Sequence, residues 1–325
     1  MSEKRLFSGI QPSGPIHLGN YLGAIKQWVE YQHDWDAYFS VVDLHALVAR
    51  PGVKDLRERT LDTLAMLIAI GIDPKSATLF VQSDVPAHSE LAWIMNCFTS
   101  IGQLSRMTQY KEKSETQGET AGLFNYPVLQ AADIALYNAE VVPVGDDQLQ
   151  HLELAREIVR SLNSYAGKEI LVEPKPLLNK SSRIMALNNP EKKMSKSVSG
   201  SAIGLLDSED EVARVIKRAV TDSDPNSSTP SGALKNLFTI LESVSDVQTI
   251  AKFEEMRVGG HLRYSELKEQ LIDDVVAFLR PIQQTYKTLR ADTGALNEIR
   301  LQGAKKAEVV ASDTLQKVKS ALGLN

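Results

Sequence analysis

The chain has 325 residues, which corresponds to about two domains, and its 43% hydrophobic and 24% charged residues are typical of a globular protein. Its formal net charge of −5 argues against a protein that coats DNA, because such proteins present a broad cationic surface. The charge still allows a local basic patch for one chosen nucleic acid.

The cysteine content and the hydropathy pattern predict the compartment. The single cysteine, Cys97, cannot form an intramolecular disulfide and is expected on an apolar helical face, packed in the core. The N-terminal residues lack the apolar core of a signal peptide, and no apolar run reaches the about 18 residues of a membrane span. These features predict a soluble, cytoplasmic protein with no membrane partner.

Strand-like and helix-like stretches alternate along the first half of the chain. Strands are expected over residues 6–10 (with a break at Ser8-Gly9), 37–44, 77–82 and 141–145, and helices over residues 20–32, 53–70, 89–99 and 147–165. This alternation predicts an α/β fold with a parallel sheet and right-handed crossovers. Such a sheet binds ligands at the carboxyl ends of its strands.

The pattern changes after about Gly200. Two capping-box signals, Ser208-x-x-Glu211 and Ser245-x-x-Gln248, precede helical runs. Apolar residues then repeat at helical spacing over residues 234–241, 267–279 and 304–322. No strand-like alternation of useful length remains, so the second domain is predicted to be all-helical. The expected division is an α/β domain over residues 1–200 and a helical domain over residues 201–325.

Residues 8–20 form a glycine-rich turn, SGIQPSGPIHLGN. Gly9, Gly14 and Gly19 let the backbone come close to a ligand, and Gly19-Asn20 is expected to open a helix. The N–H groups and the positive dipole end of that helix would favour a phosphate. Glycines alone support an ordinary strand-to-helix turn equally well.

Residues 193–197 read Lys-Met-Ser-Lys-Ser and follow another lysine, Lys192. Three cations separated by small hydroxyl residues could hold several phosphate oxygens. A solvated linker between two domains is the alternative, and a bare K-x-x-K pattern would favour the linker.

The two stretches together are far more specific than either alone. His17, Gly19 and Asn20, paired with the K-M-S-K-S run, resemble the two signature motifs of the class I aminoacyl-tRNA synthetases. Further blocks are similar to the tryptophanyl-tRNA synthetases of bacterial and organellar type: residues 9–14, 20–24, 107–114, 126–134 and 144–151. The resemblance extends from about Phe7 to the end of the chain and is densest up to Ser197.

Two positions depart from the pattern of the class. Asn20 stands where the class often has His, as is usual in this subfamily, and Asp146 stands where many members have Glu. The second change is conservative and should affect the site only weakly.

The resemblance implies a Rossmann-like catalytic domain over residues 1–200, with its signature motifs at 11–20 and 193–197. An all-helical, C-terminal anticodon-binding domain over residues 201–325 would follow it. The implied reaction joins L-tryptophan to the α-phosphate of ATP, releases pyrophosphate, and then transfers the acyl group to tRNA(Trp). Such a displacement needs positioning and charge stabilisation rather than a covalent nucleophile.

The resemblance also implies which residues act on the nucleotide. His17, Lys193 and Lys196 would be catalytic, stabilising charge on the phosphates and gripping the pyrophosphate. The residues implied to bind ATP are Gln11, Pro12, Ser13, Gly19, Asn20, Lys113, Gly145, Asp146, Asp147, Ile184, Lys193, Met194, Ser195, Lys196 and Ser197. ATP would enter with Mg²⁺, and the sequence contains no cluster of protein ligands dedicated to a metal.

Selection of tryptophan requires an acceptor, because the indole N–H is only a donor. By resemblance that acceptor is Asp133, and phenylalanine would leave its carboxylate unpaired and desolvated, which rejects phenylalanine without editing. The other residues expected around the amino acid are Phe7, Gly9, His45, Tyr126 and Gln148.

Basic residues are candidates for contact with tRNA. They concentrate within residues 175–196 and recur at 217–218, 305–306 and 317–319, and for each of the later clusters taken singly a solvated helical face is the favoured interpretation. By resemblance the protein is a homodimer in which each tRNA bridges the two subunits.

Three other classes of protein share some of these features. A tyrosyl-tRNA synthetase has the same fold and both signature motifs, but residues 9–14 and 131–134 favour the tryptophan enzyme. A non-catalytic regulator that binds tRNA or an amino acid is expected to lose His17 or a lysine of the second motif, and this chain keeps them all. A nucleotidyltransferase outside the synthetases would not need the helical domain.

Overall fold

The computed structural model describes residues 4–178, 184–195, 198, 200–226 and 229–324, with only the backbone for residues 113–117. The chain divides into two compact units. Unit 1 consists of residues 1–14, 28–179 and 292–325, and unit 2 consists of residues 15–27 and 180–291. Each unit is described by itself below.

Unit 1 is built on a five-stranded sheet in the order β3-β2-β1-β4-β5. The strands are β1 (Arg5–Ile10), β2 (Asp36–Val41), β3 (Thr78–Val81), β4 (Val141–Val144) and β5 (Lys175–Leu178). All neighbouring pairs are parallel, which confirms the predicted parallel sheet. The predicted break in the first strand is wrong, because Ser8 pairs with Phe39 and Gly9 with Ser40 in an unbroken ladder.

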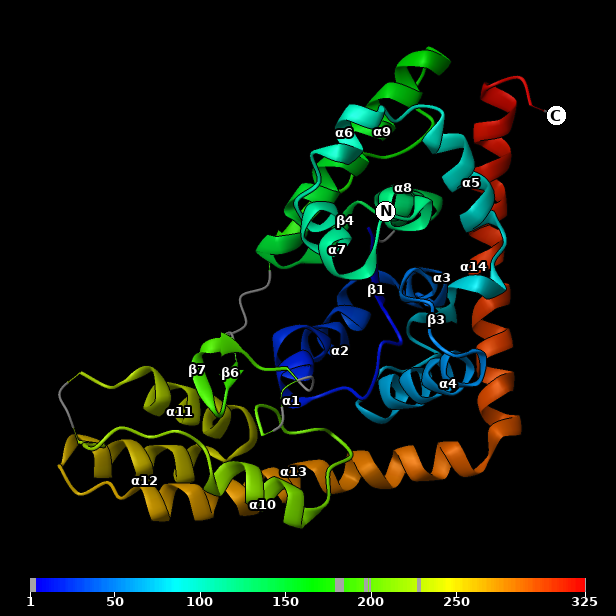
Figure 1. Ribbon diagram of the computed structural model, residues 1–325. Helices are drawn as coiled ribbons and strands as arrows, with labels where there is room; N and C mark the ends of the chain where they lie inside the picture. The colour runs from blue at the N-terminus through cyan, green and yellow to red at the C-terminus, as the bar shows by residue number, and fades with distance from the viewer. Residues whose placement is uncertain (1–3, 179–183, 196–197, 199, 227–228, 325) are drawn as a thin grey trace. The chain divides into compact units, whose positions relative to one another are not determined.

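Helices cover both faces of this sheet (Figure 1). The helices of unit 1 are α2 (Lys26–Asp34), α3 (Asp43–Ala46), α4 (Val53–Ala69), α5 (Ala87–Asn96), α6 (Ile101–Ser105), α7 (Thr108–Gln117), α8 (Ala121–Leu136), α9 (Leu149–Ala166) and α14 (Thr293–Ala321). Phe7, Tyr38 and Phe80 of the strands join a core with α5, α8, α9 and α14. Phe39 points to the opposite face, where its ring stacks on Trp28 at 5.0 Å.

Cys97 is exposed, so its predicted place in the core is wrong. Helix α5 ends at Asn96, three residues earlier than predicted, and Cys97 follows it. The Cys97 thiol lies 3.6 Å from the carbonyl oxygen of Trp93, one helical turn earlier. Trp93 is itself 71% exposed, so both residues lie on the solvent side of this turn.

Unit 2 contains a short hairpin and a group of helices. Its elements are α1 (Leu18–Asn20), a π-helical turn (Tyr21–Ile25), β6 (Met185–Ala186), β7 (Asn189–Lys193), α10 (Glu209–Lys217), α11 (Gly232–Val244), α12 (Val247–Val258) and α13 (Tyr264–Ala291). The predicted capping box of Ser208 and Glu211 is confirmed at the start of α10. The one predicted at Ser245 is wrong, because Asp246 caps α12 and the Ser245 hydroxyl donates instead to Asp274 at 2.5 Å.

The last helix, α14, belongs to unit 1, so the observed division differs from the predicted boundary at residue 200. Gly303 lies so close to edge strand β3 that a Cβ there would be 1.8 Å from the carbonyl oxygen of Leu79. Arg300 holds both carboxylate oxygens of Asp84 at 2.5 Å. Helical periodicity shows that α14 has an apolar face, but it does not show which unit covers that face.

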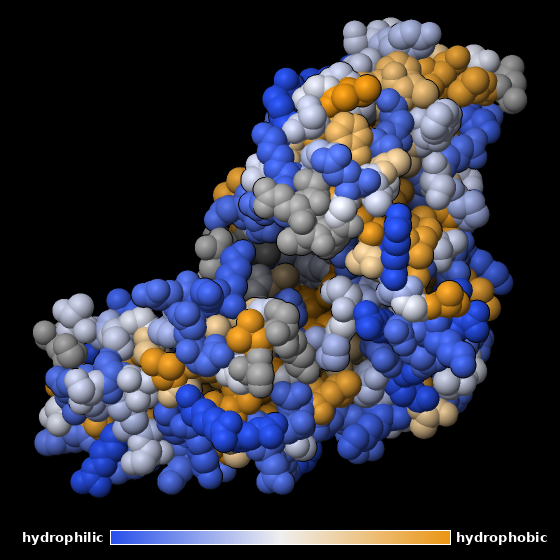
Figure 2. Space-filling view, viewed as in Figure 1, coloured by the Kyte–Doolittle hydropathy of each residue, from blue (hydrophilic) through white to orange (hydrophobic). Residues whose placement is uncertain are grey.

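The surface agrees with a globular chain. Hydrophilic side chains cover most of the face in Figure 2, and hydrophobic side chains occur on it as small separate patches. Among the described residues, no helix combines the length and the apolar character that crossing a membrane would require.

Replacement of Gly303 by alanine should lower the free energy of unfolding by about 3 kcal/mol, because the added methyl group meets strand backbone that cannot rotate away. Gly294→Ala on the same helix is the matched control, since a Cβ there meets its nearest atom at 3.4 Å. The control should stay within about 1 kcal/mol of the wild type in urea unfolding. Equal stabilities for the two variants would contradict this packing of α14.

Candidate functional site

A cavity of about 310 Å³ opens in unit 1 at the carboxyl ends of β1, β2 and β4. The structure brings to it all six residues expected around the amino acid: Phe7, Gly9, His45, Tyr126, Asp133 and Gln148. The other lining residues are Ser8, Gln11, Val42, Gln109, Gln130, Ile134, Val142, Pro143 and Val144. The position is the one at which parallel α/β sheets bind their ligands.

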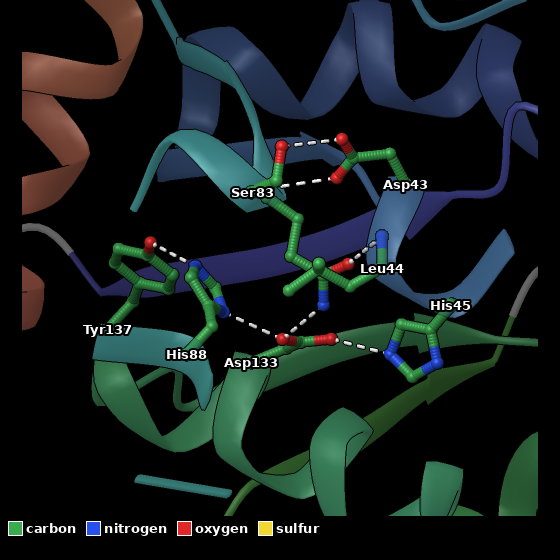
Figure 3. Close-up of polar contacts among 8 residues, drawn as sticks. Asp43, Leu44, His45, Ser83, His88, Asp133 and Tyr137 are labelled. Atoms are coloured by element: carbon green, nitrogen blue, oxygen red, sulfur yellow. Dashed lines mark hydrogen bonds and ion pairs between the residues drawn. The ribbon is translucent and has the colours of Figure 1, made fainter. Parts of the chain in front are cut away.

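Asp133 lies on α8 and is only 1% exposed. Its Oδ1 accepts hydrogen bonds from Gln82 Nε2 and His88 Nδ1, both at 2.7 Å, and its Oδ2 accepts one from His45 Nε2 at 2.9 Å (Figure 3). The ring nitrogens act as donors here because an ionised carboxylate only accepts. The Leu44 N–H donates to Gln82 Oε1 at 3.1 Å and fixes that amide.

The Asp133 carboxylate is charged in the folded protein. Burial opposes its ionisation, but the hydrogen bonds from His45 and His88 outweigh burial and hold the pKa of Asp133 below its usual value. The expectation that phenylalanine would leave this carboxylate unpaired is therefore wrong, since three protein donors already serve it.

Two of the three donors to Asp133 were missed from the sequence. Gln82 directly follows β3. Its position at the carboxyl end of a buried strand could have identified it as a candidate site residue. His88 lies in the first turn of α5, and nothing in its local pattern separates it from a histidine in an ordinary helix. Tyr137, which contacts His88 Nε2 at 2.8 Å, was missed for the same reason.

Aromatic and small residues form the walls of the cavity. The Phe7 ring stacks on Tyr137 at 5.7 Å between centroids. A Cβ on Gly9 would lie 2.9 Å from Val42 Cγ1, so the stiff side chain of Val42 favours glycine at this position. The Tyr126 hydroxyl donates to Gln109 Oε1 at 3.1 Å and lies 2.7 Å from His151 Nε2. Burial raises the pKa of Tyr126 to about 12, which keeps this wall uncharged.

Several residues expected to bind ATP also lie in unit 1. Gln11 and Ser13 are exposed just after β1, and Pro12 between them is buried. Gly145 precedes the turn after β4 (Asp146–Gln148) in which Asp146 and Asp147 lie. These two carboxylates line a second hollow of about 600 Å³, together with Thr108, Gln109, Glu112, Gln148 and Gln150.

The last residues of the first signature motif, His17 to Asn20, lie in unit 2 and form a reciprocal cap. The Asn20 N–H donates to His17 Nδ1 and the His17 N–H donates to Asn20 Oδ1, both at 3.2 Å. Because Nδ1 accepts, the proton of the neutral His17 ring is on Nε2. The Leu18 N–H donates to the Ile203 carbonyl at 2.8 Å. The expectation of N–H groups open to a phosphate is therefore wrong at Leu18 and Asn20.

The second signature motif adjoins the first within unit 2. A Cβ on Gly19 would lie 3.1 Å from Met194 Cβ, so the two motifs meet at a glycine that leaves room for a methionine. Met194 and Ile184 are buried side by side, with the Met194 N–H donating to the Ile184 carbonyl at 3.3 Å. Lys193 ends β7 and is exposed, and Ser195 follows Met194.

Three of the expected ATP residues fall outside what the structure describes. Lys196 and Ser197 lie outside the described residues, and the side chain of Lys113 does as well. Their predicted roles rest on the sequence.

Comparisons with known proteins identify the family. The family model for class I tRNA synthetases (W and Y) matches residues 2–280. The chain belongs to this family. It is 44% identical over 329 residues to the tryptophan–tRNA ligase of Clostridium tetani, covering 99% of this chain and 96% of that one. It is 45% identical over 328 residues to the ligase of Clostridium perfringens, covering 99% and 98%.

A solved structure gives the same result. The tryptophanyl-tRNA synthetase of Campylobacter jejuni, complexed with ADP and tryptophan, superposes with a TM-score of 0.89 at 34% identity, covering 98% of this chain and 100% of that one. The predicted family, the Rossmann-like α/β fold with a helical C-terminal region, and the enzyme class, an aminoacyl-tRNA synthetase, are confirmed.

The lowered pKa of Asp133 predicts how the free energy of unfolding depends on pH in acid. The unfolded chain protonates this carboxyl near its ordinary pKa of about 3.9, whereas the folded chain, with its lowered pKa, does so only at lower pH. Its contribution to folding is therefore complete above about pH 5 and is lost as the pH falls. The stability gap between the wild type and Asp133→Asn should narrow from pH 6 to pH 3 in urea unfolding.

Asp34→Asn provides the control, because the Asp34 side chain is exposed and its charge is already solvated. A gap between wild type and Asp133→Asn that stays constant across this pH range would show that the folded carboxyl is not held in its charged form.

Proposed function

We propose that this chain is a tryptophan–tRNA ligase that activates L-tryptophan with ATP and transfers it to tRNA(Trp). The observation that carries the proposal is the cavity at the carboxyl edge of the sheet, with aromatic walls and one buried, charged acceptor, Asp133. Its full-length relatives from two Clostridium species bear the same activity in their names. A tryptophan side chain has the matching features, an aromatic body and one N–H donor.

Recognition of the indole would use the less occupied oxygen of Asp133. Oδ1 already accepts two hydrogen bonds, from Gln82 and His88, whereas Oδ2 accepts one, from His45. A carboxylate oxygen has about two lone-pair sites, so the indole N–H would bind Oδ2. Phe7 and Tyr126 would contact the ring as walls of the cavity.

Activation would form a bond between the tryptophan carboxylate oxygen and the α-phosphorus of ATP, while the bond from that phosphorus to the bridging oxygen of pyrophosphate breaks. The His17 Nε2–H would donate to a phosphate oxygen as charge develops. Lys193 and Lys196 would neutralise the leaving pyrophosphate, and Met194, which lies between them in the sequence, is buried. Gln11, Ser13, Gly19 and Asn20 would contact the nucleotide, and Asp146 and Asp147 would accept its ribose hydroxyls.

Mg²⁺ would arrive as the partner of ATP. Magnesium retains several waters and is usually held by substrate phosphates with one or two carboxylates. Among the described residues, no group of three or more His, Cys, Asp or Glu side chains could hold a metal ion. The phosphates of ATP would therefore supply the charge that binds Mg²⁺.

The tRNA would contact the helical part of unit 2, where Lys217 and Arg218 end α10. The basic clusters near the C-terminus include two lysines that already have partners in unit 1. Lys306 donates to the Pro74 carbonyl at 2.8 Å, and Lys319 pairs with Glu90 at 2.7 Å. These two lysines connect α14 to the rest of unit 1. They could contact an RNA only if those contacts were broken.

A homodimer would be formed through an apolar face of unit 1. Leu47 and Trp93, which are 52% and 71% exposed, border a groove of about 460 Å³ beside α8. Contiguous apolar surface, as in this groove, marks association surfaces in proteins. We further place the protein in the cytoplasm, whose reducing conditions suit the exposed Cys97 thiol.

The purified protein should exchange labelled pyrophosphate into ATP only when L-tryptophan is present, because the first step is reversible and needs the matching amino acid. All twenty amino acids should be compared in parallel. Exchange supported equally by tyrosine would favour the tyrosine branch of the same family, and exchange without any amino acid would contradict the proposed reaction.

Replacement of Lys196 by alanine should lower the rate of pyrophosphate exchange at least a hundredfold while tryptophan binding changes little, because a phosphate-binding cation acts on the transition state. Lys192→Ala is the matched control, since Lys192 is an exposed neighbour on β7. Equal losses of tryptophan affinity and exchange rate would assign Lys196 a structural role instead.

A further inference from the structure

We propose that Tyr137 is a positioning residue for the tryptophan pocket: its hydroxyl fixes the tautomer of His88 so that the imidazole donates to Asp133. The inference rests on the proposed function, because it assigns Asp133 to the indole N–H. Neither Tyr137 nor His88 lines the cavity, so His88 and the Tyr137 hydroxyl would act on tryptophan through Asp133.

The three residues form a buried chain of hydrogen bonds from α5 and the end of α8. His88 Nδ1 lies 2.7 Å from Asp133 Oδ1, and His88 Nε2 lies 2.8 Å from the Tyr137 hydroxyl (Figure 3). An ionised carboxylate only accepts, so Nδ1 carries a proton. In the neutral ring Nε2 is then an acceptor, and the Tyr137 hydroxyl donates to it.

The Tyr137 hydroxyl keeps its proton in the folded protein. Its ring is fully buried and stacks on Phe7 at 5.7 Å and on Tyr38 at 4.6 Å between centroids. Burial raises the pKa of Tyr137, and the nearby Asp133 charge raises it further. The hydroxyl is therefore protonated in the folded protein, and the buried, stacked ring holds it beside His88 Nε2.

The alternative tautomer of His88 would weaken the binding of the indole N–H by Asp133. With its proton on Nε2, the ring would turn the lone pair of Nδ1 toward Asp133 Oδ1, only 2.7 Å away. A repelled carboxylate would rotate or take up a proton, and either change would weaken Oδ2 as the acceptor of the indole N–H. The Tyr137 hydroxyl opposes this tautomer, because it would have to accept from Nε2–H, and its own buried proton would then have no other acceptor among the described residues.

The test is Tyr137→Phe, which keeps the stacked ring and removes only the hydroxyl. In pyrophosphate exchange the KM for tryptophan should rise about tenfold, the cost of one disturbed buried hydrogen bond, while the KM for ATP stays within twofold. Tyr38→Phe is the matched control, because it removes a hydroxyl from the same aromatic cluster but not from the chain to Asp133. The control should leave both KM values within twofold.

Nitrogen-15 NMR of the imidazole supplies a readout that a purely structural role would not move. The wild type should show His88 protonated at Nδ1 and not at Nε2. In Tyr137→Phe, protonation at Nε2 should become detectable. His88→Asn offers a shorter amide donor in place of Nδ1. Adding Tyr137→Phe to His88→Asn should then cost less than twofold, because the hydroxyl acts only through the imidazole.

Several results would overturn the inference. One is a folded Tyr137→Phe with unchanged tryptophan KM, and another is equal losses in Tyr137→Phe and Tyr38→Phe. A wild-type His88 protonated at Nε2 alone would do so even if Tyr137→Phe fails to fold. If the wild type itself shows no tryptophan-dependent exchange, the proposed function fails, which is a distinguishable outcome.

Discussion

The buried charge of Asp133 is the constraint on which the recognition site depends. A carboxylate removed from water costs several kcal/mol unless donors replace the lost solvation. The three donors come from separate elements: His45 from α3, Gln82 from the turn after β3, and His88 from α5. The sheet must therefore hold these elements close to α8 before the Asp133 carboxylate can be buried in its charged form.

This dependence extends to parts of the fold that do not touch the cavity. The turn that carries Gln82 also carries Asp84, which Arg300 of α14 holds through both carboxylate oxygens. Ser83 in the same turn donates to Asp43 at 2.6 Å, which ties the turn to the start of α3. Helix α14 thus stabilises the turn that carries Gln82, a donor to Asp133. The close packing of α14 on β3 therefore supports the site, although α14 does not touch the cavity.

The two kinds of binding residue are distributed differently over the molecule. Every residue that we propose for the tryptophan side chain lies in unit 1, so the proposed specificity pocket lies within one compact unit. The residues assigned to ATP are divided, with Gln11 and Asp146 in unit 1 and His17 and Met194 in unit 2. Within unit 2 the two signature motifs meet at Gly19, whose missing side chain makes room for Met194.

The sequence by itself determined the features that depend on local periodicity and on motifs. The helix expected over residues 53–70 is α4 (Val53–Ala69), and the six residues expected around tryptophan share one cavity. Only the tertiary structure decided that His88 and Gln82 reach Asp133, that α14 packs on β3, and that Cys97 is exposed. Periodicity reports which face of an element is apolar, whereas a hydrogen bond between residues 45 or 51 positions apart forms only when packing brings their elements together.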